Sequence, residues 1–179
     1  RQVVAADQEN ATARYNLGRC LIDLRNFSEA ERVYEEHIEK NPGDAEAFNH
    51  LGLARLAKGS PVEAESCFRT AIQLNDQEPV FHANLAQTLA QLGNSDEAGQ
   101  SHEQAVHLDP SSARLRVQHG WFLLDAGDLA KAEDRFREAL QRNPEHVEAS
   151  AGLAAALEQR DEYRVGLQVL RPFISAVHP

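Results

Sequence analysis

The polar side chains with the most regular spacing in this sequence can nearly all donate and accept hydrogen bonds. They form a column of positions 34 residues apart: Asn16, His50, Asn84, Gln118 and Gly152. Amide and imidazole groups can bind the N–H and C=O groups of a peptide backbone whatever its side chains are. Carried on successive copies of one helix, this column would form a hydrogen-bonding ladder for an extended peptide. The alternative is that these groups only bind neighbouring helices or water.

The histidines and cysteines do not have the spacing of a catalytic or metal site. No HExxH motif is present, and Cys20 and Cys67 fit neither CxxC nor a zinc pattern. His82, His102 and His119 could gather between the third and fourth copies of the repeat, but no cysteine or paired acid completes a ligand set. Nucleotide-binding and nucleophile motifs are also missing from the sequence. We therefore expect no enzyme activity, no metal and no cofactor, and we interpret both cysteines as free thiols.

The elements that carry the polar column repeat every 34 residues, without insertion or deletion, from residue 11 to residue 179. A fixed period of this length indicates a repeat array. Each copy contains two amphipathic helical patterns. We predict first helices at 11–24, 45–58, 79–92, 113–126 and 147–160, and second helices at 28–41, 62–75, 96–109, 130–143 and 164–177. Gly59, Gly93 and Gly127 follow first helices, where they can supply left-handed caps.

Two further columns predict how the helices of one copy pack. Small residues recur at Gly18, Gly52, Ala86, Gly120 and Ala154, and large rings recur at Tyr34, Phe68, His102 and Phe136. We expect the small residues to let the two helices approach closely, with the rings filling the space beside them. An amphipathic pair of this kind cannot cover its own apolar face, so successive pairs must stack.

The residues Leu17, Gly18, Ala30, Tyr34 and Pro42, repeated with the same period, resemble the tetratricopeptide repeat (TPR) family. The resemblance covers nearly the whole chain. It implies an all-α fold, a right-handed α-solenoid of stacked helix-turn-helix hairpins (a TPR superhelix) whose first helices line a concave groove. It also implies a scaffold that binds a peptide or protein segment and carries no chemistry of its own.

The repeat boundaries follow from the period. We divide the chain into the tail of a preceding repeat helix at 1–10, four repeats at 11–44, 45–78, 79–112 and 113–146, and a degenerate fifth repeat at 147–179. In the fifth copy Asp161 replaces the turn glycine, and Pro172 should kink or end the second helix. Because the chain contains no Met, we expect a processed chain or a fragment. The last helix is too apolar for a terminal cap, so we expect more chain or a partner to cover it; self-association through the uncapped end helices is a further possibility.

The charge excludes some classes of partner. The net charge is −10, and the copy at 79–112 contains no Lys or Arg. Nucleic acids are bound by clustered cations, so we expect no nucleic-acid partner. No stretch approaches the ~20 apolar residues that span a bilayer, so we expect no membrane insertion. The compartment is not determined by the sequence, although free thiols favour the cytoplasm.

Phase along the first helices gives the candidate groove residues. They are Tyr15, Asn16, Arg19, Asn49, His50, Asn84, Gln87, Arg114, Gln118, Trp121 and Asp125. Trp121 is either an anchor for the partner or a ring packed between repeats. The carboxylate clamp of chaperone-binding TPR proteins is incomplete here, because Asn49 and Leu53 stand where it needs Lys and Asn, and Gln118 stands where it needs a second cation beside Arg114. We expect a protein-interaction scaffold; the alternative is the substrate-docking arm of a larger enzyme, such as a transferase.

Overall fold

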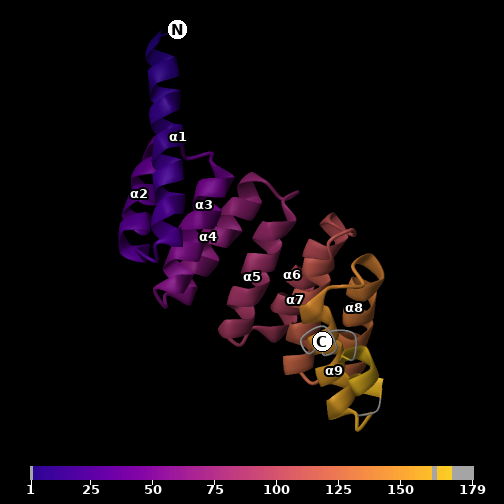
Figure 1. Cartoon of the computed structure of the whole chain (residues 1–179). Helices are drawn as coiled ribbons and strands as arrows, with labels where there is room; N and C mark the ends of the chain where they lie inside the picture. Colours follow the sequence, from indigo (N-terminus) through magenta and orange to yellow (C-terminus); the bar gives the residue numbers. More distant parts are fainter. Residues whose placement is uncertain (1, 163–164, 171–179) are drawn as a thin grey trace. The chain divides into compact units, whose positions relative to one another are not determined.

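The computed structural model of the chain describes residues 2–162 and 165–170, and this part of the chain is all α-helical apart from short turns. Its helices are α1 (Gln2–Asp23), α2 (Phe27–Lys40), α3 (Ala45–Ala57), α4 (Pro61–Leu74), α5 (Pro79–Gln91), α6 (Ser95–Leu108), α7 (Ala113–Asp125), α8 (Leu129–Arg142) and α9 (Val147–Gln159) (Figure 1). Residues 165–170 are also helical. None of these helices is long and apolar enough to cross a bilayer.

The helices form two compact units, and each unit is built by stacking helical hairpins. In unit 1 (Arg1–Asn94), each of α1 to α4 packs on the next helix, and α3 also touches the first helices α1 and α5. In unit 2 (Ser95–Pro179), α6 packs on α7, α7 on α8 and α8 on α9. The predicted all-α fold of stacked helix-turn-helix hairpins is therefore confirmed.

The helix bounds agree with the sequence pattern to about one residue, except at the two ends of the chain. Helix α1 begins at Gln2 instead of residue 11, because segment 1–10 contains neither Gly nor Pro to interrupt it. Residues 2–10 therefore run into the first helix of repeat 1 without a turn. The predicted helix at 164–177 is described only over 165–170, so the predicted kink at Pro172 lies outside the described residues. The repeat boundaries stay a prediction.

The turn that ends each first helix uses a left-handed residue at the same position of every repeat. Gly59, Gly93 and Gly127 have φ values of 85°, 82° and 80°. Arg25 and Asp161 take the same conformation at φ 59° and 62°. The left-handed caps predicted at the three glycines are confirmed. Arg25 and Asp161 hold the conformation at an energetic cost, because their Cβ atoms crowd the backbone there.

The close approach of the two helices in a hairpin depends on a glycine facing a ring. A Cβ added at Gly18 would lie 2.6 Å from Tyr34, and one added at Gly52 would lie 2.7 Å from Phe68. The same contact occurs between Gly120 and Phe136 at 2.7 Å. These distances leave no room for a methyl group. The packing predicted from the small and large columns is therefore confirmed at these hairpins.

An ion pair between successive repeats recurs in both units. Glu31 on α2 binds Lys58, which caps the C-terminus of α3. Glu133 on α8 binds Arg160, the residue at the same place after α9. In both pairs the partners are 27 residues apart in sequence. The second helix of one repeat is thereby tied to the end of the next first helix.

Candidate functional site

The first helices of unit 1 bring two of the predicted groove residues into direct contact. The Asn84 Nδ2 group on α5 donates a hydrogen bond to Asn49 Oδ1 on α3, over 2.7 Å. Asn49 is only 3% exposed, whereas Asn84 is half-buried. The buried amide of Asn49 therefore fixes the orientation of the more accessible amide of Asn84.

His50 and Tyr15 pack against other rings. The His50 ring stacks on Tyr34 with centroids 5.6 Å apart and an interplanar angle of 8°. Tyr15 meets His50 edge-on at 5.5 Å and meets Tyr34 edge-on at 6.1 Å. Burial lowers the pKa of His50, and the positive charge of Arg19 lowers it further. His50 is therefore neutral near pH 7, and within the described residues its buried Nδ1 has no hydrogen-bond partner.

The remaining predicted residues of unit 1 are exposed to solvent. Asn16 and Arg19 lie on α1, and Gln87 lies on α5. Gln87 follows Asn84 by three residues, and Arg19 follows Asn16 by three, so each pair shares one side of its helix. We call the surface formed by Tyr15, Asn16, Arg19, His50, Asn84 and Gln87 the unit 1 face. It combines freely accessible polar groups with a half-buried centre.

In unit 2 the predicted residues lie along one stripe of α7. Arg114 and Asp125 are exposed, and Gln118 and Trp121 are half-buried. Trp121 meets Phe136 edge-on, with centroids 5.4 Å apart, and packs against the core of unit 2. Gln118 Oε1 is buried, and no group in the described part of the chain donates to it. Trp121 is thus partly a packing residue, and its role as an anchor for a partner stays a prediction.

The three histidines that the sequence grouped together belong to different units. His102 and His119 stack in unit 2, with ring centroids 5.4 Å apart, whereas His82 belongs to unit 1 and lies 3.1 Å from the backbone oxygen of Asp76. No three His, Cys, Asp or Glu side chains among the described residues are placed to hold a metal ion. Cys20 is exposed, Cys67 is buried, and both are free thiols, as predicted.

Comparison with family models places TPR units along most of the chain. Two tetratricopeptide repeat models match residues 1–52 and 45–78. A third model, the middle TPR-like domain of cilia and flagella-associated protein 70, matches residues 82–170.

Curated relatives match parts of the chain at moderate identity. DnaJ homolog subfamily C member 3 of Rattus norvegicus is 29% identical over 133 residues, which cover 74% of this chain and 26% of the relative. Small glutamine-rich tetratricopeptide repeat-containing protein 2 of Mycosarcoma maydis is 30% identical over 101 residues, 56% of this chain and 28% of the relative. The matched region of this chain thus spans about a quarter of the length of these relatives.

Solved structures share the fold at low sequence identity. Pseudomonas aeruginosa PilF superposes with a TM-score of 0.83 and 22% identity, over 94% of this chain and 77% of PilF. YrrB superposes with a TM-score of 0.70 and 20% identity, over 95% of this chain and 88% of YrrB. These two structures show that the fold is shared. The three family models, which match residues 1–52, 45–78 and 82–170, show that the chain belongs to the tetratricopeptide repeat family.

Proposed function

We propose that the unit 1 face binds an extended segment of another protein and recognises its backbone through Asn84. The observation that carries this proposal is the 2.7 Å hydrogen bond that Asn84 donates to Asn49. The bond uses one N–H of the Asn84 amide and leaves its second N–H and its Oδ1 for a ligand. Because Asn49 is buried, the amide is already ordered before binding, and little conformational entropy is lost when a ligand arrives.

The other residues of the unit 1 face suit a backbone that passes along the first helices. Gln87 and Asn16 add exposed amides that donate and accept, and Arg19 adds a cation for a carboxylate or carbonyl oxygen. His50 is neutral near pH 7 because burial lowers its pKa, so it adds a polar edge without a charge. Such a surface discriminates weakly between side chains, and we propose that it accepts segments of varied sequence.

The α7 stripe of unit 2 is proposed as a second contact surface, considered by itself. Trp121 supplies a large half-buried ring, and anchors of this type contribute strongly to binding where a partner covers them. Gln118 lies half-buried one turn before Trp121 on the same stripe and adds a polar side chain to it. Arg114 and Asp125 flank these two residues as exposed charges.

The comparisons support a protein or peptide as the class of partner. YrrB, with which this chain shares its fold, is described as a TPR protein with an unusual peptide-binding site. A net charge of −10 disfavours nucleic acid. The proposal assigns no catalytic step to the chain and no role in binding to a cofactor. Self-association through the end helices stays a prediction, although Leu17 on α1 is 50% exposed where the aligned Leu51 is 4% exposed.

Selection of peptide ligands followed by matched substitutions tests this function. Short random peptides would be selected on the whole chain, and dissociation constants would be measured by fluorescence anisotropy. Gln87→Ala removes an exposed amide from the unit 1 face, and Gln73→Ala removes another exposed amide from the second helix α4. We expect Gln87→Ala and Arg19→Ala each to weaken binding about five- to tenfold, and Gln73→Ala to have no effect. Equal effects of Gln87→Ala and Gln73→Ala would contradict the proposal.

A further inference from the structure

At one place in unit 2, histidine replaces the usual residue in two columns of the repeat. His102 stands in the column of Tyr34, Phe68 and Phe136, and His119 stands in the column of Leu17, Leu51, Leu85 and Leu153. Elsewhere the two columns meet in apolar contacts: Tyr34 belongs to one core cluster with Leu51, and Phe136 belongs to another with Leu153. Where the two histidines replace these residues, their imidazole rings stack instead, at an interplanar angle of 6°.

The histidine pair is buried and uncharged. His102 is 2% exposed and His119 is 5% exposed. Burial lowers the pKa of His102 to about 3. Burial, together with the charges of Arg135 and Lys131, lowers the pKa of His119 to about 4. Within the described residues His119 Nδ1 has no hydrogen-bond partner. Burying a polar pair among apolar residues lowers the stability of the fold unless its nitrogen atoms find hydrogen-bond partners. The groups that surround His119 are therefore informative.

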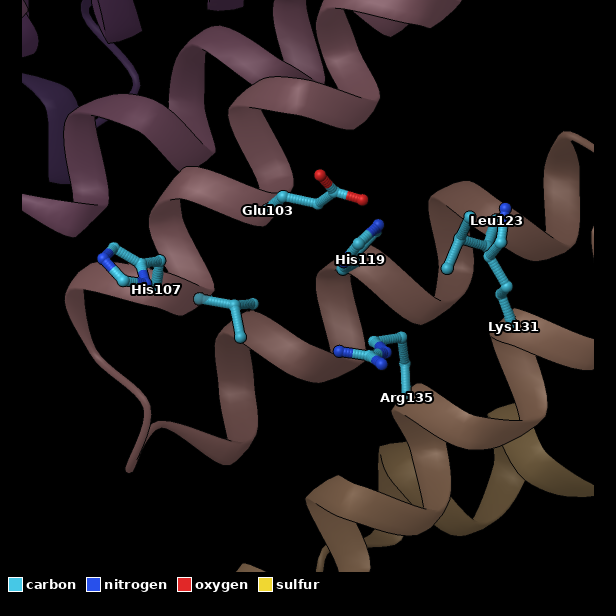
Figure 2. Close-up of a pocket in the computed structure, with 7 residues that line it drawn as sticks. Glu103, His107, His119, Leu123, Lys131 and Arg135 are labelled. Carbon is cyan, nitrogen blue, oxygen red and sulfur yellow. The ribbon is translucent and has the colours of Figure 1, made fainter.

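His119 lines an open pocket of about 280 Å³ whose residues come from three helices of unit 2. The lining residues are Glu103, Val106 and His107 from α6, His119 and Leu123 from α7, and Lys131 and Arg135 from α8. Figure 2 shows the side chains of Glu103, His119 and Arg135 on three different helices that line this pocket. None of the predicted groove residues lines it, so the pocket is separate from the α7 stripe.

Each of the two cations in the pocket keeps donors that its known partner does not use. Lys131 Nζ lies 2.8 Å from Asp128 Oδ2, and Arg135 Nη2 lies 3.1 Å from Glu138 Oε1. An ammonium carries three N–H donors and a guanidinium five, so each group can hold a further acceptor. His119 is neutral and can donate one more hydrogen bond from its ring without adding charge. Val106 and Leu123 supply apolar surface beside these donors.

We propose that this pocket binds a single carboxylate group carried on a short apolar stem. The carboxylate accepts hydrogen bonds from Arg135 and from the ring N–H of His119, Lys131 adds positive charge nearby, and the stem contacts Val106 and Leu123. A guanidinium matches the geometry of a carboxylate. A dianion such as phosphate is disfavoured, because Glu103 lines the pocket and each cation already has one carboxylate partner. The carboxylate comes either from a free small acid or from an aspartate or glutamate side chain of a bound protein.

Nuclear magnetic resonance of the histidine rings in the whole chain tests this site. The probes are sodium isovalerate, which has a carboxylate on an apolar stem, and N-acetyl-glutamate N-methylamide, which represents a protein side chain. The uncharged 3-methylbutanol and inorganic phosphate are the ligand controls. Arg135→Gln removes the guanidinium of the pocket, and Arg142→Gln removes an exposed one from the last turn of the same helix. Circular dichroism melts establish that both variants are folded.

We expect saturable shifts of the His119 ring signals with a carboxylate probe, and a higher pKa of His119 when the probe is bound, because the negative charge favours the imidazolium. Binding should weaken about five- to tenfold in Arg135→Gln and stay unchanged in Arg142→Gln. Tighter binding of isovalerate identifies a free acid as the source, and tighter binding of the glutamate derivative identifies a protein side chain. The proposal is overturned if neither carboxylate shifts His119, if 3-methylbutanol or phosphate binds as well, or if the folded Arg135→Gln variant binds normally.

Discussion

Asn84 Nδ2 donates to Asn49 Oδ1 over 2.7 Å, and this bond joins two first helices through residues that the 34-residue alignment does not match. Asn84 aligns with His50, which instead stacks on Tyr34. On α3 the hydrogen-bond partner of Asn84 is therefore the residue just before the aligned position. Asn49 takes a buried, supporting place, and Asn84 remains the accessible member of the pair. The proposed binding role of the unit 1 face depends on this division.

A double-mutant cycle measures the coupling of these two amides. Asn84→Ala leaves the buried Asn49 amide without its partner and should lower the free energy of unfolding by ~1–2 kcal/mol. The combination with Asn49→Ala should cost less than the sum of the two single variants, with a coupling of ~1 kcal/mol. Urea denaturation of the four proteins provides the numbers. Additive effects would mean that the hydrogen bond does not contribute to stability.

The substitution Gly52→Ala tests the packing of the two helices inside a hairpin. In Gly52→Ala the new methyl group meets the rigid ring of Phe68 at 2.7 Å, so the helices must separate. We expect a loss of ~1–3 kcal/mol in the free energy of unfolding. Gly43→Ala is the matched control, because nothing lies within 4 Å of a Cβ there. A melting temperature of Gly52→Ala equal to that of Gly43→Ala would show that this contact is looser than the structure has it.

The left-handed turns predict two stabilising substitutions. Arg25→Gly and Asp161→Gly replace the residues that hold φ at 59° and 62° with the residue found at the aligned turns. Each should raise the free energy of unfolding by ~0.5–1 kcal/mol. The gain should be larger at Arg25, since Asp tolerates this conformation better than Arg does. Differential scanning calorimetry checks both, with Gly93→Ala expected to shift the melting temperature in the opposite direction.

The features that the sequence predicted well depend on residues inside one repeat. The glycine turns and the contacts of Gly52 with Phe68 and of Gly120 with Phe136 follow from local backbone rules and from the two columns. Contacts between repeats are harder to predict from the sequence, because they depend on how far each helix is rotated about its own axis. The pairing of Asn84 with Asn49 is one such contact, and the edge-on contact of Tyr15 with His50 is another.

The pocket beside His119 also depends on contacts between repeats, which the sequence does not predict. Lys131 and Arg135 lie on a second helix, where the sequence pattern indicates only a charged outer surface. The one signal available beforehand was the replacement of leucine by His119 in its column. The half-burial of Trp121 was also undecided, because a tryptophan on a first helix can pack on a neighbouring ring or face a partner.

The buried histidine pair predicts a dependence of stability on pH. The pKa values of His102 and His119 are about 3 and about 4 in the folded chain, below the 6.5 of an unburied imidazole. As the pH falls below 6.5, the unfolded chain takes up protons at these positions before the folded chain does. The free energy of unfolding should therefore be unaffected by this pair above about pH 7 and should fall progressively toward pH 4.

Substitution by the residues of the aligned columns removes this effect. The double variant His102→Phe, His119→Leu should lose less melting temperature than the wild type between pH 7 and about pH 4.5. His107→Gln, at an exposed position, is the control and should keep the wild-type profile. Identical profiles for wild type and the double variant would show that the pair does not govern the acid sensitivity.

The side-chain amide of Asn84 gives the most direct test of the proposed function. In an isotope-labelled chain, its NH₂ signals can be followed while the tightest selected peptide is added. We predict that these signals shift strongly and saturably, together with the backbone amides of Asn16, Arg19 and Gln87, while α2 and α4 stay unchanged. If the Asn84 signals do not move and signals of α2 or α4 shift instead, the unit 1 face is not the binding surface.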